Sequence, residues 1–325
     1  MTISRRQFLS TLAMSSLGAT RLLSEIRTSP VPAKACAWSD NLNPKMIAIV
    51  GDVQRTSLAE LSFMGRGQYD AEREAILSAI GDDKPDMVMM LGDQVVAGDD
   101  EAQWTYFDEC MQKINDGRIP VYSMLGNHDY GEDRGRCLRN YTERFPHLDG
   151  RQSMVKIGSL AIVSVNSNFD QLRSSEIRQQ EEDYNKWLKE LDADPAVRGI
   201  IVASHHPPYT NSDLGANREV IEMFAKPFLA ARKTRLYLAG HVHSYERFVA
   251  GDKTFVTSGG GGGPRRLVDN SSSRPFQNDA YRIGTLRPFH YIRLKIGENE
   301  LKGEVVMLQR GKFHVGDRFA VGLYG

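Results

Sequence analysis

The chain has 325 residues, enough for one large domain or two small ones. Its 41% hydrophobic and 25% charged residues match ordinary globular proteins, which argues against a disordered chain. The formal net charge is zero, so the basic footprint of a nucleic-acid-binding protein is missing, and no window offers the roughly 18 unbroken apolar residues of a membrane helix.

Residues 1–37 have the layout of an export signal. Arg5 and Arg6 precede a modest apolar segment at residues 8–19, and "SRRQFL" resembles the twin-arginine motif of the bacterial Tat pathway. This pattern predicts export to the periplasm or the outside of a bacterial cell, with the Tat translocase as a partner during export. The alternative is an amphipathic N-terminal helix, and two small-x-small sequences within residues 33–37 leave the cleavage site open.

Removing this signal leaves residues 38–325 with a net charge of −4, because the signal holds five basic residues and one acidic residue. A mildly acidic body gives no indication of nucleic-acid specificity. Of the three cysteines, Cys36 lies in the predicted cleavage region, and lipidation there stays open. Cys110 and Cys137 could pair as a disulfide in an exported protein, or remain two unpaired small hydrophobic residues.

Short apolar runs alternate with longer amphipathic stretches along the rest of the chain. Six apolar runs predict buried strands, at residues 45–52, 86–93, 121–127, 160–166, 199–206 and 235–241. Between them, helical periodicity predicts helices at residues 69–80, 101–115, 177–191 and 218–231. Pro227 should kink or end the last helix, because proline cannot donate the backbone hydrogen bond there.

After about residue 250 the pattern becomes more purely β, with "KTFVTS", "HYIRLKI" and "LKGEVVML" as predicted strands. The alternation before it predicts a layered α/β domain, and this final group of strands suggests a second sheet packed on the first. Five consecutive glycines at residues 259–263 indicate a place where the backbone closely approaches something else.

Five of the predicted strands end in residues that commonly bind metals. In open α/β sheets, ligands bind outside the carboxyl ends of the strands, so these side chains could converge on one crevice. Five of the eight histidines lie at these strand ends. The full set is Asp52 and Gln54, Asp93, Asn127 with His128 and Asp129, His205 with His206, and His241 with His243.

Carboxylate, amide and imidazole groups together suit borderline metals such as Mn, Fe or Zn. A carboxylate can bridge two ions, and the i, i+2 spacing of His241 and His243 puts both imidazoles on one face of an extended segment. Taken singly, each motif has an ordinary alternative: a turn for "GD", an Asx-capped turn for "GNHD" and a satisfied histidine pair for "GHVH". Their joint occurrence at successive strand ends favours a metal site.

The order GD–GD–GNHD–H–GHxH resembles the calcineurin-like metallophosphoesterase superfamily over roughly residues 45–265, and "GHVHSYERF" is similar to purple acid phosphatases. The resemblance implies one domain over residues 38–325, a four-layer αββα sandwich of two mixed sheets. It also implies two divalent or mixed-valence ions (Fe, Mn or Zn) at the C-terminal strand ends. In the implied ligand set Asp93 bridges the ions, Asp52 and His243 hold the first, and Asn127, His205 and His241 hold the second.

The sequence departs from the resembled pattern at two positions. Gln54 stands where many members have a histidine ligand, and its amide oxygen would bind a metal more weakly. Val96 stands where purple acid phosphatases carry a metal-bound tyrosine, so this protein should not be purple. The aspartate and Arg-Gly pair of the protein Ser/Thr phosphatases are also missing, which argues against that family.

The resemblance implies hydrolysis of a phosphoric ester of a small substrate by a metal-bridging hydroxide, as in a phosphatase or phosphodiesterase similar to acid phosphatases. His128 would stabilise the phosphoryl group or protonate the leaving oxygen. Asp129 either orients His128 or caps a turn, and His206 and Arg55 either touch phosphate oxygens or only pack nearby. The alternative function is a non-catalytic metal-binding or interaction scaffold on the same fold.

Overall fold

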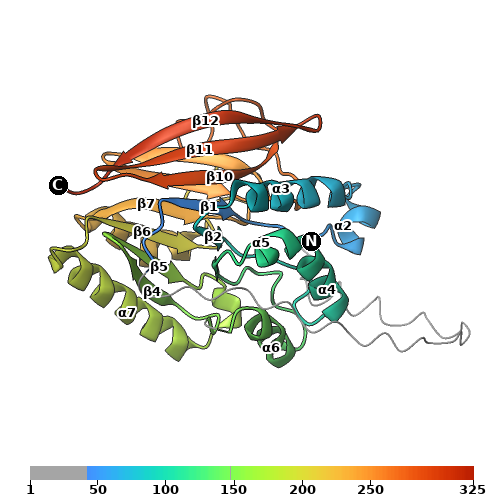
Figure 1. Cartoon of the computed structure of the whole chain (residues 1–325), viewed down its shortest axis with the longest axis horizontal. Helices are drawn as coiled ribbons and strands as arrows, with labels where there is room; N and C mark the ends of the chain where they lie inside the picture. Colours follow the sequence, from blue (N-terminus) through green and yellow to red (C-terminus); the bar gives the residue numbers. More distant parts are fainter. Residues whose placement is uncertain (1–41, 147) are drawn as a thin grey trace, which may run out of the picture. The chain divides into compact units, whose positions relative to one another are not determined.

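The computed structural model describes residues 42–146 and 148–325, so the predicted export signal lies outside the described residues. The described residues form two six-stranded sheets, each mixed, with helices against them (Figure 1). This arrangement confirms the predicted α/β class with two mixed sheets. Among the described helices, none has the length and apolar character needed to cross a bilayer.

The first sheet joins strands from both ends of the described chain. In pairing order its strands are β12 (Lys312–Gly322), β11 (Glu300–Gln309), β10 (Phe289–Ile296), β1 (Met46–Val50), β2 (Met87–Met90) and β3 (Val121–Ser123). β1, β2 and β3 run parallel to one another, whereas β10 pairs antiparallel with the other edge of β1.

The second sheet is built from the middle of the chain. Its strands, again in pairing order, are β4 (Ser153–Ile157), β5 (Leu160–Val165), β6 (Gly199–Ser204), β7 (Thr234–Ala239), β9 (Lys253–Ser258) and β8 (Tyr245–Ala250). β5, β6, β7 and β9 are parallel, and an antiparallel strand closes each edge.

The expectation that the final strands form a second sheet of their own is wrong. β10, β11 and β12 continue the first sheet beside β1, while β9 belongs to the second sheet. The reason is that β2 pairs with only one edge of β1, which leaves the backbone N–H and C=O groups of the other edge without partners. β10 pairs with this edge, and Ile47 lies opposite Leu294.

Side chains alternate across the second sheet between two apolar layers. Ile162 and Ile201 lie in the cluster that includes β1 and β2, whereas Val163 and Val202 lie in the cluster that includes Tyr184 of helix α7 (Ser174–Ala193). Because successive residues of a strand point to opposite faces, each strand contributes to both layers. The result is the helix–sheet–sheet–helix layering that the sequence predicts.

The helices match the prediction in part. The segment predicted at residues 101–115 divides at Met111, and the one predicted at residues 218–231 contains a π-helical turn just before Pro227. The helical elements are α2 (Leu58–Phe63), α3 (Asp70–Asp83), α4 (Glu101–Cys110), α5 (Gln112–Asp116), α6 (Arg134–Arg144), η1 (Phe169–Gln171), α7 (Ser174–Ala193), α8 (Arg218–Val220), η2 (Ile221–Ala225) and α9 (Lys226–Ala230).

Helix α6 was missed because its sequence, "RGRCLRNYTER", is mostly polar. Asp133 caps it by accepting the backbone N–H of Arg136, and Cys137 and Tyr141 form its buried face. Arg144 is also buried, where its guanidinium pairs with Asp108. Cys137 of α6 and Cys110 of α4 are both free thiols, so they do not form a disulfide.

Candidate metal centre

The predicted metal ligands lie just beyond the carboxyl ends of strands from both sheets. In the first sheet, Asp52 follows β1, Asp93 follows β2 and Asn127 follows β3. In the second sheet, His205 follows β6 directly, and His241 and His243 follow β7. Parallel strands in each sheet direct these ends to one edge, which explains how residues far apart in sequence come together.

Four of these residues hold an unusual backbone conformation. Asp52, Asp93, His241 and His243 have positive φ angles of 59°, 55°, 70° and 46°. They are four of the seven non-glycine residues with positive φ in the described chain. Such a conformation costs an L-residue on the order of 1–3 kcal/mol and is concentrated at functional sites. One contribution that stabilises it is the backbone N–H of His241, which donates to the Asp52 carboxylate at 2.9 Å.

Asp52, Asp93 and His243 form one group of possible ligands. Their ligand atoms lie within 4.8 Å of one another, and all three residues are buried. The Nε2 of His243 is 3.4 Å from an Asp52 oxygen, while its Nδ1 lies 2.9 Å from the carbonyl oxygen of Pro264. A metal-bound imidazole commonly donates its second ring N–H to such a carbonyl, which leaves Nε2 for the ion.

Gln54 lies against this first group. Its Nε2 is 3.2 Å from an Asp93 oxygen and 3.0 Å from the Nε2 of His243. Its Oε1 is buried without a hydrogen-bond partner. In this orientation Nε2 faces the ligand atoms, and turning the amide over would direct the unpaired oxygen to a cation held by Asp93 and His243.

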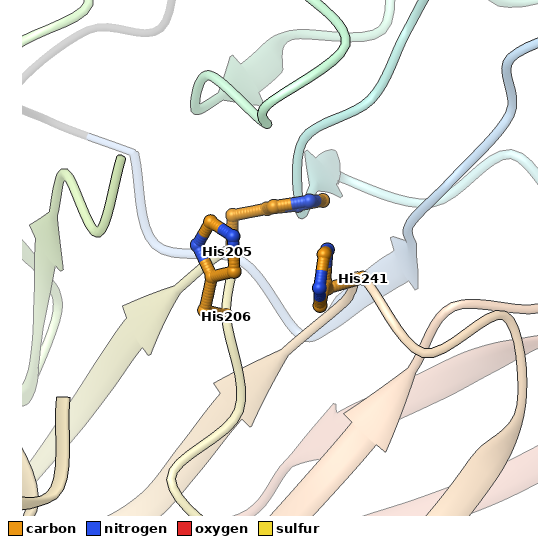
Figure 2. Close-up of side chains that lie close together, drawn as sticks. All are labelled: His205, His206 and His241. Atoms are coloured by element: carbon orange, nitrogen blue, oxygen red, sulfur yellow. The ribbon is translucent and has the colours of Figure 1, made fainter. Parts of the chain in front are cut away.

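His205, His206 and His241 form the second group, shown in Figure 2. Their ligand atoms also lie within 4.8 Å of one another. The Nε2 of His205 is 3.2 Å from the Asn127 side-chain oxygen and 3.4 Å from an Asp93 oxygen. Asp93 therefore contacts both groups, which is the position that a bridging carboxylate would need.

The charges at the centre are unevenly distributed in the absence of metal. Burial alone would raise the pKa of Asp93, but the positive charges of His205 and His128 hold it well below its ordinary value. Burial alone would lower the pKa of His205, but the Asp93 carboxylate raises it to about 9. Burial and the His205 charge lower the pKa of His206 to about 3 and place that of His241 well below its ordinary value. A metal that binds His205 must therefore displace a proton.

His128 and Asp129 follow Asn127 but serve different contacts. Asp129 is buried and accepts the backbone N–H groups of residues 93, 94, 95 and 126. Of the two roles predicted for it, this geometry favours the turn cap. The backbone N–H of His128 donates to Asp93 at 2.8 Å, and its Nδ1 lies 3.1 Å from the carbonyl oxygen of Val96.

The structure does not bring Arg55 into the cluster of ligand atoms. Its guanidinium pairs with Asp70 at 2.9 Å and stacks over the ring of Tyr106 at 4.7 Å. These contacts correspond to the packing role that the sequence left as the alternative for Arg55.

The glycine run at residues 259–263 lies so close to the first group of ligands that larger residues would not fit there. A Cβ atom at Gly259 would lie 2.7 Å from an Asp52 oxygen, and one at Gly263 would lie 2.9 Å from the His243 ring. The backbone N–H of Gly263 donates to the Asp52 carbonyl. The close approach predicted from the sequence is thus an approach to the ligands themselves.

Ser167 was not predicted from the sequence. Its hydroxyl lies 2.9 Å from the Nδ1 of His206 and also accepts the His206 backbone N–H. Ser167 is buried just after β5, in the stretch "NSNFD". A serine after a strand is too common to indicate such a contact without the structure.

The chain is similar to known phosphoesterases over most of its length. A model of the calcineurin-like phosphoesterase family matches residues 45–245. The chain is 26% identical over 296 residues to "Probable inactive purple acid phosphatase 9" of Arabidopsis thaliana, which covers 73% of this chain and 44% of the relative. Purple acid phosphatase 3 of the same plant is 31% identical over 160 residues, 44% of this chain and 43% of the relative. The chain thus spans less than half the length of these curated relatives.

A solved structure shares the fold. The purple acid phosphatase PPD1 from yellow lupin (Lupinus luteus) seeds has a TM-score of 0.65 to this chain at 16% identity. The match covers 88% of this chain and 55% of the lupin chain. The resemblance predicted from the motif order is confirmed.

Proposed function

Because this chain belongs to the calcineurin-like phosphoesterase family, we propose that it hydrolyses phosphoric esters of small molecules with two bound metal ions. One observation carries the proposal: carboxylate, amide and imidazole donors from both sheets meet around Asp93, which contacts both groups of ligands. A fold needs no such gathering of buried charged and polar groups for stability, because burying them costs free energy unless they are paired or bind a metal.

In this proposal Asp52, Gln54 and His243 would hold the first ion, Asn127, His205 and His241 would hold the second, and Asp93 would serve both. The donor types favour Fe, Mn or Zn. When bound, two such ions would lower the pKa of a water between them and supply hydroxide as the nucleophile at neutral pH.

His128 would act on the phosphoryl group. Its Nδ1 is held by the Val96 carbonyl oxygen, and its backbone N–H by Asp93, so the ring orientation is fixed relative to the bridging carboxylate. Because the Val96 carbonyl oxygen accepts the Nδ1–H, Nε2 of the half-buried ring can donate to a phosphoryl oxygen or to the leaving oxygen when the ring is an imidazolium. Asp129 supports this position by holding the turns that carry Asp93 and Asn127.

A non-catalytic metal-binding or interaction scaffold is the second candidate. It is favoured by the printed name of the relative "Probable inactive purple acid phosphatase 9", which is similar to most of this chain. The two candidates differ in a measurable way, since a scaffold would bind ions without splitting esters.

The test is an assay of an aryl phosphate monoester and an aryl phosphate diester, with Mn, Fe, Zn and Ni supplied separately and with elemental analysis of each sample. We expect turnover of at least one ester by protein that holds about two ions per chain. A fully loaded protein that splits neither ester would favour the scaffold. The ratio of the two rates separates a phosphatase from a phosphodiesterase.

We also propose that the protein is exported through the Tat pathway to the periplasm or the cell exterior. The proposal is supported by the paired arginines Arg5 and Arg6 ahead of a short apolar segment. In a bacterial host, changing both arginines to lysine should retain the protein in the cytoplasm, whereas an equal change at Arg21 and Arg27 should not. Unchanged export of the first variant would refute a twin-arginine route.

A further inference from the structure

We propose that His206 is a third imidazole ligand of the second ion, so that this ion binds His205, His206 and His241 together with Asn127 and Asp93. The inference rests on the two-metal centre proposed above. It replaces the prediction that His206 contacts the substrate, and it gives the chain one imidazole more than the implied ligand set.

The first support is the position of the ring. Residues that follow one another in a strand point to opposite faces, but β6 ends at Ser204, so His205 and His206 are released from that alternation. The ring centroid of His206 lies 4.2 Å from that of His241 and 5.0 Å from that of His205 (Figure 2). The three imidazoles thus gather where β6 and β7 end.

The second support is the way in which the ring is oriented. His205 and His243, both in the implied ligand set, direct Nδ1 to a carbonyl oxygen, of Leu91 at 2.8 Å and of Pro264 at 2.9 Å. His206 directs Nδ1 to the Ser167 hydroxyl at 2.9 Å. A carbonyl oxygen only accepts, so it fixes the tautomer of His205 and His243 and leaves their Nε2 for the ion, whereas the Ser167 hydroxyl orients the ring of His206 in either tautomer.

The Ser167 hydroxyl is itself held in place. It accepts the backbone N–H of His206 at 2.9 Å, so one serine oxygen orients both the backbone and the ring of the same residue. Ser167 is buried, which protects this pair of hydrogen bonds from competition by water. An orientation fixed at two points fits a ligand better than a residue that must adapt to a substrate.

One tautomer of the His206 ring suits a metal ligand. The tautomer with its proton on Nδ1 donates to the Ser167 oxygen, and Nε2 of that tautomer carries a lone pair. This lone pair can bind a metal ion beside His205 and His241.

The experiment measures metal binding directly. Apo-protein prepared with a chelator is titrated with Zn²⁺ by calorimetry, and the absorption spectrum of the Co²⁺-loaded protein is recorded, for the wild type, His206→Ala, His206→Gln and Ser167→Ala. His314→Ala, a change at an exposed histidine, is the matched control. Circular dichroism checks that each variant is folded. If His206→Ala does not fold, His206→Gln takes its place in the comparison.

We expect the wild type to bind two ions. His206→Ala should weaken one of them by about 100-fold or more and change the Co²⁺ spectrum, while Ser167→Ala should weaken the same ion by about 10-fold, since outer partners contribute 10–100-fold to affinity. His314→Ala should match the wild type.

Two outcomes would overturn the inference, and they differ from each other. If His206→Ala binds both ions as the wild type does and only raises KM for an ester, His206 is a substrate contact and the proposed function stands. If the wild type itself does not bind a pair of ions, the two-metal centre fails and this inference fails with it.

Discussion

The two halves of the candidate metal centre differ in donor type and in access. The first half contains two carboxylates, one imidazole and the amide of Gln54, and its Asp52, Asp93 and His243 are only 0%, 1% and 6% exposed. The second half contains three imidazoles and the amide of Asn127, and His206, His241 and Asn127 are only half-buried. The first half is therefore enclosed by protein, and a substrate would approach the centre from the second half.

The largest expected effect comes from the residue that belongs to both halves. Asp93→Asn removes a charge that lies within contact of Gln54, His205 and the backbone of His128. We expect loss of both ions and of all turnover, because neither half keeps its shared anionic donor. Elemental analysis checks the result, and a variant that keeps two ions would contradict the bridging role of Asp93.

The next largest effect separates chemistry from metal binding. His128→Ala should retain both ions but lower kcat by about 10²–10⁴-fold, the usual contribution of a general acid. The measurement is turnover alongside metal content in the same sample. Wild-type turnover with intact metal content would show that His128 takes no part in the reaction. It would also argue against approach of the substrate from the second half of the centre.

A buried histidine beside the enclosed first half, His290, should make the folding stability depend on pH. His290 is fully buried against Gly260 of the glycine run, its Nε2 has no partner, and burial lowers its pKa from 6.5 to about 4. Between pH 6.5 and 4 the unfolded chain takes up a proton that the folded chain does not. The folding stability should therefore fall as the pH drops through this range, by about 2 kcal/mol at pH 5 and about 3 kcal/mol in total, and be unaffected above it.

Urea unfolding of the wild type and of His290→Gln at pH 7 and pH 5 measures this contribution as a difference. The variant should lose about 2 kcal/mol less between the two pH values than the wild type. His314→Gln, at an exposed histidine, should behave as the wild type does. Parallel pH profiles for all three proteins would show that His290 takes up its proton equally in both states.

The smallest effect concerns one ligand of the enclosed half. Gln54→Ala should weaken one ion by about 10-fold and leave the other unchanged, whereas Gln54→His should tighten the same ion, because imidazole is a better donor than an amide for borderline metals. Zn²⁺ calorimetry reports both changes, with the exposed Gln68→Ala as the control. If Gln54→Ala and His206→Ala affected the same ion, the division of the centre into two halves would be wrong.

The sequence predicted the parts of the fold that depend on local patterns. The strand predicted from "KTFVTS" is β9, and the apolar runs before Asp52, Asp93, His205 and His241 are all strands. The convergence of these residues could be predicted because they share one position, the residues just after a strand, and parallel strands end at one edge.

What the sequence could not predict depends on contacts between distant segments. β10 pairs with β1, but it could have paired with another free sheet edge, and no local sequence pattern specifies which edge a strand joins. The polar helix α6 is stabilised by its cap and by the pairing of Arg144 with Asp108, not by apolar periodicity. Likewise, the orientation of His206 comes from Ser167, 39 residues earlier in the chain.

The left-handed backbone at Asp52, Asp93, His241 and His243 has a consequence for how this protein could change over generations. Glycine would adopt these angles without steric cost, but at Asp52 and Asp93 it would also remove carboxylates that accept backbone N–H groups. A descendant that no longer needed the ions could gain stability by exchanging the two histidines for glycine. Aspartate and histidine kept at these four positions among relatives of this chain would therefore indicate selection for ion binding.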